Sequence, residues 1–267
     1  MLYSKITEKT PVLKGWSSDR KYKVIIDGLP YLLRISSAEK YDRILRQFRQ
    51  AQTVAALGLP MCRPLEFGTC PEGVYVIQNW IEGRDAEVVL TEISETEQYA
   101  YGLDAGKILQ KIHTIPAPAD ISDWEERFNR KIDRKIAMYE NCPQKYSRDK
   151  EMLRYLAQNR HLLRNRPQCY QHGDYHLGNM MIDEAGILTI IDFDRDDYGD
   201  PWEEFNRIVW CAQKAPAFAC GMVDGYFNGS VPMAFWELLL LYICSNTFAH
   251  FFLSADDIQH IITNLES

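Results

Sequence analysis

The chain has 267 residues, of which 25% are charged and 46% hydrophobic, as is ordinary for a folded soluble protein. This length allows one large domain or two small ones, and a core that needs no disulfide bond or metal ion. The formal net charge of −7 argues against a general nucleic-acid-binding protein, so we expect no nucleic-acid partner.

The chain shows no targeting or membrane-spanning signal. Its N-terminus, MLYSKITEKT, is too polar for a signal peptide. The most apolar run, from Leu238 to Leu253, is short and is interrupted by Ser245, Asn246 and His250, so it predicts a buried helix and no membrane partner. Seven scattered cysteines without a Cys-x-x-Cys pair are typical of reduced thiols, and we expect a cytoplasmic protein.

The first eighty residues predict a small antiparallel sheet with one helix. Asp27-Gly28 is a turn signal between two short strands, and Gly58 with Pro60 ends the helix that follows. The order is hairpin, helix, hairpin, with strands at 22–26, 31–36, 64–68 and 74–78 and a helix at 38–57.

After Gly83 the pattern becomes mainly helical. Ser94 and Glu97 form a capping box that opens a helix ending near His113. Further helices are predicted near 123–140, 148–163, 202–214 and 233–253, and a short hairpin joins 180–182 to 188–191.

Charge is uneven along the chain. Residues 1–82 contain 12 Lys/Arg and 8 Asp/Glu, whereas the remainder contains 18 and 29. Between Asp183 and Glu204 there are nine acidic residues and one basic residue, Arg195. The asymmetry suggests two parts that bind different ligands, and drift in surface composition explains it equally well.

The segment from His172 to Asn179 reads HGDYHLGN, and Asp192 follows between apolar residues after a short hairpin. Phosphoryl transfer from a nucleotide needs a carboxylate that accepts the proton of the attacking hydroxyl, and Asp174 fits this role. It also needs an amide oxygen and a second carboxylate to hold Mg²⁺, and Asn179 and Asp192 fit these roles. The alternative is a polar turn with Asp and Asn as turn formers, which does not explain three such groups around one hairpin.

The segments HGDYHLGNMMID and IDFDRDDYGDPWEEF resemble the aminoglycoside phosphotransferase family and its choline-kinase-like relatives, and the resemblance covers most of the chain. It implies an α+β, bilobal protein-kinase-like fold, with an antiparallel-sheet lobe at 1–82 and a mainly helical lobe at 83–267. It also implies a kinase that phosphorylates a small-molecule hydroxyl with ATP or GTP and Mg²⁺. In this family Asp174 would be the base, and Asn179 and Asp192 the Mg²⁺ ligands.

The resemblance also assigns supporting and nucleotide-binding residues. His172 and His176 would hold the catalytic loop, and Asp200 before Pro201 would be structural. Ser17 and Ser18 occupy the place of the loop that covers the nucleotide phosphates. Asn79 and Ile81 lie at the hinge between strand and helices, where the backbone would bind the purine.

One feature departs from the family pattern. The phosphate-gripping lysine of the second strand is replaced by Arg34, and its partner glutamate, counted back from Gly58, is replaced by Gln47. A guanidinium can grip two phosphate oxygens, but Gln47 provides no countercharge. Glu39 or Asp42 would provide one from the same helix.

The acceptor is predicted to be a small molecule, because no long activation segment follows Asp192. The acidic run from Asp194 to Glu204 would attract a cationic acceptor, or it caps a helix near Trp202. Three functions remain open: a kinase of an aminoglycoside-like antibiotic, a metabolic kinase of an amino alcohol or sugar, and a catalytically weak nucleotide-binding protein. The sequence gives no information about protein partners.

Overall fold

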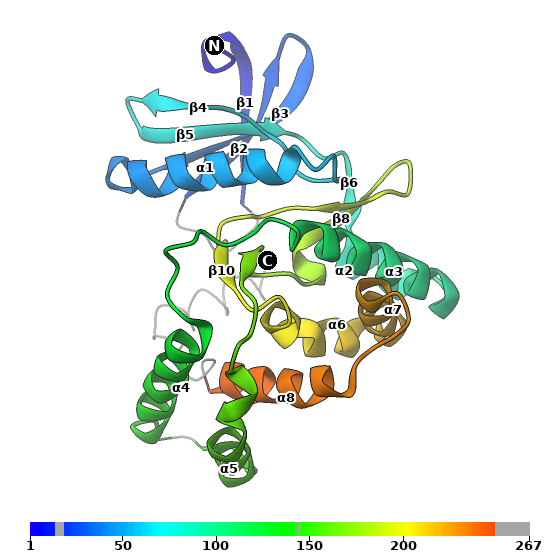
Figure 1. The fold of residues 1–267 in the computed structure, drawn as a ribbon. Helices are drawn as coiled ribbons and strands as arrows, with labels where there is room; N and C mark the ends of the chain where they lie inside the picture. Colours follow the sequence, from blue (N-terminus) through cyan, green and yellow to red (C-terminus); the bar gives the residue numbers. More distant parts are fainter. Residues whose placement is uncertain (14–18, 144, 249–267) are drawn as a thin grey trace. The chain divides into compact units, whose positions relative to one another are not determined.

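The computed structural model describes residues 1–13, 19–143 and 145–248. These residues form two compact units. Figure 1 shows their helices and strands. Among these residues, the first unit consists of Met1–Ile115, Tyr170–Asp197 and Ile208–Ser230, and the second of Pro116–Cys169, Tyr198–Arg207 and 231–248. The division into lobes at residue 82 stays a prediction. None of the helices in the described ranges has the length and apolar character needed to cross a membrane.

The first unit begins with a five-stranded antiparallel sheet in the order β1-β2-β3-β5-β4. Its strands are β1 (Ile6–Val12), β2 (Arg20–Ile26), β3 (Leu29–Ser36), β4 (Pro64–Cys70) and β5 (Gly73–Asn79). Asp27 and Gly28 take φ angles of 50° and 82° in the β2–β3 turn, the left-handed conformation that such a tight hairpin requires. Strand β1 was not predicted, because its sequence ITEKTPV is mostly polar and exposed.

Both faces of the sheet have buried side chains. Val24, Leu33 and Ile77 belong to a core on one face. Helix α1 (Tyr41–Ala55) packs on the other, where Ile44 meets Val76 (Figure 1). Because side chains alternate along a strand, Lys21, Arg34 and Val76, which are aligned across three strands, lie on the helix-covered face.

A second small sheet follows in the order β6-β8-β9. It joins β6 (Gly83–Asp85) to the predicted hairpin of β8 (Met180–Asp183) and β9 (Leu188–Ile190). The helices of this unit are α2 (Ala86–Glu92), α3 (Glu95–Ile112), α6 (Ile208–Lys214) and α7 (Pro216–Phe227). The capping box of Ser94 and Glu97 is present at the start of α3.

Helices α3 and α7 pack at short range through glycines. A Cβ added to Gly102 would lie 2.2 Å from the Phe218 carbonyl oxygen, and one added to Gly221 would lie 2.2 Å from the Tyr99 carbonyl oxygen. Helix α7 was not predicted, because apolar residues lie on all its sides and its sequence shows no helical periodicity.

The second unit contains α4 (Trp124–Glu140), α5 (Asp149–Asn159) and α8 (Met233–Thr247). The Asp200 carboxylate is fully buried there, 2.6 Å from Arg166 Nε and 2.6 Å from the Tyr242 hydroxyl, which donates to it. Tyr242 in turn accepts a hydrogen bond from Trp124 Nε1. This network ties α4 and α8 to the Asp200 segment, in agreement with a structural role for Asp200.

Short elements complete the chain. They are the 3₁₀ turns Tyr3–Lys5, Ala38–Lys40, Arg160–Leu163, Leu177–Asn179 and Glu203–Arg207, and the strands β7 (Cys169–Gln171) and β10 (Asp197–Gly199). All seven cysteines are free.

Candidate functional site

The segment that carries Asp174 is held by a buried histidine. His172 is fully buried, its Nε2 lies 2.9 Å from the Ile191 carbonyl oxygen, and its Nδ1 lies 3.3 Å from the Asp174 amide nitrogen. A carbonyl must receive a proton and an amide must give one, so the imidazole is neutral with its hydrogen on Nε2. His172 thereby links the Asp174 loop to the strand end that leads into Asp192.

Glycine at position 173 is required by the same loop. Gly173 has a φ angle of 81°, and a Cβ there would lie 1.8 Å from the Arg195 carbonyl oxygen. No side chain fits in that space. The close approach brings the Arg195 segment against the loop, and Arg195 Nε lies 3.5 Å from the Asp174 carboxylate.

His176 supports Asp174 from the other side. Its Nδ1 accepts a hydrogen bond from the Gly178 amide at 3.1 Å, and its Nε2 lies 3.4 Å from Asp174 Oδ1. The edge of the ring meets Trp210, with the ring centroids 5.2 Å apart. The Asp174 carboxylate therefore lies between an imidazole and a guanidinium.

Asn179 and Asp192 are placed beside this loop. The Asn179 side-chain NH₂ group donates to the Asp174 backbone carbonyl oxygen at 2.9 Å, and the Asn179 backbone carbonyl oxygen accepts from the Ile191 amide at 3.0 Å. Asp192 takes a φ of 66°, and the next residue, Phe193, is buried against the His172 ring with the centroids 4.5 Å apart. The structure thus brings the three predicted residues Asp174, Asn179 and Asp192 together in one unit.

The donor set suits a magnesium ion that is shared with phosphates. The NH₂ group of Asn179 is engaged, which leaves its Oδ1 as an acceptor, and Asp192 adds a partly exposed carboxylate. Mg²⁺ is commonly bound by one or two protein oxygens, with water and substrate phosphates completing its coordination. Within the described residues, no group of three or more His, Cys, Asp or Glu side chains could hold a metal ion by itself.

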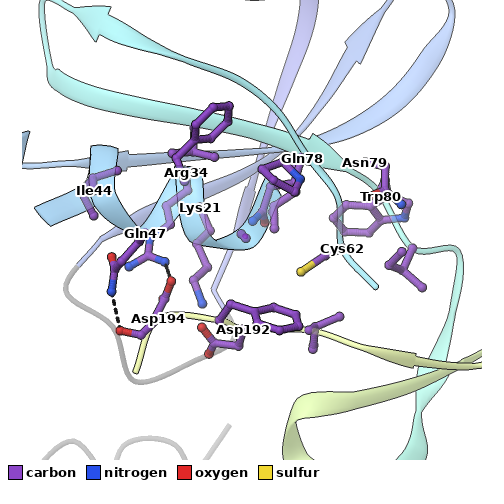
Figure 2. A pocket seen from close by; sticks show the side chains of 18 of the residues that line it. Lys21, Arg34, Ile44, Gln47, Cys62, Gln78, Asn79, Trp80, Asp192 and Asp194 are labelled. Atoms are coloured by element: carbon purple, nitrogen blue, oxygen red, sulfur yellow. Dashed lines mark hydrogen bonds and ion pairs between the residues drawn. The ribbon is translucent and has the colours of Figure 1, made fainter. Parts of the chain in front are cut away.

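A pocket in the first unit opens next to Asp192 (Figure 2). Twelve apolar side chains form most of its wall: Leu32, Ile44, Phe48, Ala51, Cys62, Pro64, Val76, Trp80, Ile81, Met181, Ile191 and Phe193. Its polar lining consists of Lys21, Arg34, Gln47, Gln78, Asn79, Asp192 and Asp194. An apolar slot with a few charged groups fits a flat heterocycle joined to an anionic group.

The predicted nucleotide-binding residues fall as follows. Arg34, Asn79 and Ile81 all line this pocket, whereas Ser17 and Ser18 lie outside the described residues. The Asn79 amide already donates to the Arg63 carbonyl oxygen at 3.2 Å, and the Asn79 side chain accepts from the Arg63 amide. Asn79 is thereby fixed at the end of β5.

The guanidinium of Arg34 is held by two carboxylates. Arg34 forms ion pairs with Asp19 and with Asp194, and Lys40 Nζ lies 2.8 Å from the second oxygen of Asp19. Gln47 does not pair with Arg34; its side-chain amide donates to the Asp194 carbonyl oxygen at 2.6 Å (Figure 2). The countercharge expected from Glu39 or Asp42 therefore comes instead from two residues outside the helix.

The two carboxylates have opposite pKa shifts. Burial raises the pKa of Asp19, but hydrogen bonds and charges from Lys40 and Arg34 outweigh it and lower the pKa to about 2. Burial is the main cause that raises the pKa of Asp194 to about 6; the charge of Arg34 opposes this shift, and the neighbouring Asp192 adds to it.

Sequence reasoning missed Asp19, Lys21 and the pairing role of Asp194. A signal for Lys21 lay just outside the predicted hairpin: extending its first strand, 22–26, by one residue places Lys21 directly opposite Arg34 and on the same face. No local pattern could reveal that Asp194 meets Arg34, since 160 positions separate them and only the fold brings them together.

The sequence profile of the phosphotransferase enzyme family (APH) matches residues 9–236. The chain belongs to this family. The match includes the Asp174 loop, Asp192 and most of the described residues of both units. None of the curated proteins matches the chain.

Solved structures of the family share the fold. The apo form of a thermostable mutant of aminoglycoside phosphotransferase APH(4)-Ia is 17% identical, with a TM-score of 0.65 over 92% of this chain and 87% of that chain. The streptomycin–ATP–APH(2″)-IIa ternary complex is 16% identical, with a TM-score of 0.68 over 95% and 88%. ADP-bound APH(2″)-Ib is 17% identical, with a TM-score of 0.63 over 91% and 82%. The predicted α+β, kinase-like fold is thereby confirmed.

Proposed function

We propose that this phosphotransferase moves the γ-phosphate of ATP or GTP to a hydroxyl group of a small molecule, with Mg²⁺ bound. The observation that carries the proposal is the Asp174 loop, which is locked by His172 to the strand end preceding Asp192. Three side chains with the chemistry of phosphoryl transfer are held there, next to a pocket of suitable lining.

Asp174 is the proposed general base. Its carboxylate accepts the proton of the acceptor hydroxyl while the hydroxyl oxygen forms a bond to the γ-phosphorus and the bond to the nucleoside diphosphate breaks. His172 fixes the backbone at Asp174, and His176 and Arg195 flank the carboxylate. Such prior positioning lowers the barrier, because the base does not have to be ordered during the reaction.

Asn179 and Asp192 are the residues that would hold the magnesium ion. When bound, the ion would offset the negative charge of the nucleotide phosphates. The hydrogen bond from Asn179 to the Asp174 carbonyl keeps the proposed ligand and the proposed base in a fixed relation. Asp192 reaches its place because its backbone adopts the left-handed conformation, while buried Phe193 anchors the segment.

The purine is proposed to lie in the apolar part of the pocket, beside Asn79 and Ile81 at the end of β5. Figure 2 shows Asn79 and Trp80 on one side of the pocket and Arg34 and Asp194 on the other. A nucleotide spanning the two sides would direct its phosphates to the charged groups. Ser17 and Ser18 remain proposed phosphate contacts on the basis of their position in the sequence.

The proposed acceptor is a small hydroxylated molecule. Aminoglycosides are the first class to test, because solved relatives include ternary complexes with streptomycin and with hygromycin B. A positive charge on the acceptor remains a proposal from the acidic sequence around Asp192, since Asp194 and Asp196 are already paired with Arg34 and Arg46.

The test is a panel of aminoglycosides, amino alcohols and sugars, incubated with the enzyme, Mg²⁺ and either ATP or GTP. We expect one class to gain a phosphate, seen as an 80 Da increase in mass, with one equivalent of nucleoside diphosphate released. Nucleotide binding without transfer to any acceptor in the panel would instead favour a catalytically weak nucleotide-binding protein.

A further inference from the structure

We propose that Lys21 of β2, and not Arg34 of β3, is the cation that contacts the phosphates of the bound nucleotide. This inference rests on the proposed function and specifies one of its contacts. It moves the phosphate-binding charge from one strand of the sheet to its neighbour.

The placement of Lys21 follows from strand register. Lys21 and Arg34 are directly opposed in the β2–β3 pair, so their side chains leave the sheet on the same face. Both line the pocket that also contains Asp192. Figure 2 shows the Lys21 side chain extending from its strand into this pocket. Lys21 can therefore reach a ligand in the pocket from a position beside the one Arg34 occupies.

The positive charge of Arg34 is already balanced by carboxylates. Its Nε lies 2.7 Å from Asp19, and it forms a second ion pair with Asp194. Together with Lys40, which also binds Asp19, the four groups carry two positive and two negative charges. A triphosphate would have to displace a buried carboxylate to gain the guanidinium, because only 2% of the Asp19 side chain is exposed.

Lys21 is in the opposite situation. In the described part of the chain its ammonium group forms no hydrogen bond or ion pair, although the side chain is only partly exposed. An ammonium group has three donors and a compact charge, and it suits phosphate oxygens. Among the cations that line the pocket, Lys21 is therefore the one whose charge is not already offset by a carboxylate.

If Lys21 contacts the phosphates, Arg34 has a structural role. Arg34 and Gln47 hold Asp194 by its carboxylate and by its carbonyl oxygen, two residues after Asp192. They fix the segment that bears the proposed metal ligand. Of the two basic side chains that line the pocket, Lys21 is then the one that can contact the nucleotide phosphates while Arg34 stays paired with Asp194.

The experiment compares the affinities of the wild-type chain, Lys21→Met and Lys21→Arg for ATP, ADP and adenosine by calorimetry in Mg²⁺ buffer. We expect Lys21→Met to bind ATP about 10- to 100-fold more weakly, the effect of losing one charged hydrogen bond to phosphate. Adenosine, which has no phosphate, should bind Lys21→Met as it binds the wild-type chain, and this also shows that the variant is folded. Lys21→Arg should recover most of the ATP affinity.

The matched control is Lys9→Met, which removes the same charge from the same sheet but outside the pocket, where Lys9 pairs with Glu72. Its ATP affinity should equal that of the wild-type chain. If Lys21→Met binds ATP as tightly as the wild-type chain does, the inference is wrong and the proposed function stands. The same holds if Lys9→Met loses as much ATP affinity as Lys21→Met. Failure of the wild-type chain to bind any of ATP, ADP, GTP and GDP overturns the proposed function and the inference with it.

Discussion

Asp19→Asn tests whether the buried ion pairs around Arg34 stabilise the fold as the structure indicates. The substitution keeps the shape of the side chain and removes the charge that meets Arg34 and Lys40. In the wild-type chain these cations lower the Asp19 pKa from 3.8 to about 2. At about 1.36 kcal/mol per pKa unit, the ionised carboxylate contributes up to roughly 2 kcal/mol to the free energy of unfolding.

The sign of the pH dependence follows from the direction of the shift. A carboxyl group whose folded pKa is lowered contributes stability above its unfolded pKa, and this stability is lost as pH falls through the folded pKa. We therefore expect Asp19→Asn to be about 2 kcal/mol less stable than the wild-type chain at pH 7, and the difference to fall to roughly half at pH 3.

Urea unfolding at pH 7, 5, 4 and 3 measures this difference. The control is Asp133→Asn, which removes a carboxylate of 64% exposure from a surface pair with Arg160 and should cost at most about 1 kcal/mol. A cost for Asp19→Asn that is the same at pH 7 and pH 3, or no larger than that of the control, would refute the electrostatic argument.

Two further substitutions test the packing around the site and in the second unit. Gly173→Ala places a Cβ against the Arg195 carbonyl at a φ of 81° and should lower the free energy of unfolding by more than about 2 kcal/mol. Gly229→Ala has a similar φ of 76° with open space around it, so thermal unfolding should show a clearly smaller loss; equal losses would contradict the close approach at Gly173. Tyr242→Phe removes the hydroxyl between Trp124 and buried Asp200 and should cost about 1–3 kcal/mol in urea unfolding. Tyr155→Phe, which loses an exposed bond to the Glu237 carbonyl, should cost less, and the reverse order would count against the Asp200 network.

Much of the fold could be predicted from local signals. The Asp27-Gly28 turn, the Ser94 capping box and the hairpin before Asp192 each depend on residues close together in the sequence, and all three are present. The elements that were not predicted, β1 and α7, have a physical reason in common. Strand β1 has no apolar alternation, and α7 is apolar on all sides, so their structure is decided by neighbouring elements rather than by their own pattern.

The candidate site divides in the same way. Asp174, Asn179 and Asp192 could be proposed from the sequence because they flank one short hairpin and chemistry restricts the residue types; their roles stay predictions. The partners of Arg34 were not, because Asp19 and Asp194 approach it only after the sheet and the segment beyond Asp192 have packed. The family pattern could indicate Arg34 as a phosphate-binding residue, but it could not show that Asp19 and Asp194 already balance its charge.

The most direct test of the account is the rate of phosphoryl transfer by Asp174→Ala, measured at saturating ATP and Mg²⁺ with the acceptor that the panel identifies. The account predicts a fall in kcat of about 10²- to 10⁴-fold, as expected for the loss of a general base, while ATP still binds. Glu184→Ala, which removes an exposed carboxylate from the neighbouring hairpin, should keep the wild-type rate. An unchanged kcat in Asp174→Ala would contradict the assignment of Asp174 as the catalytic base.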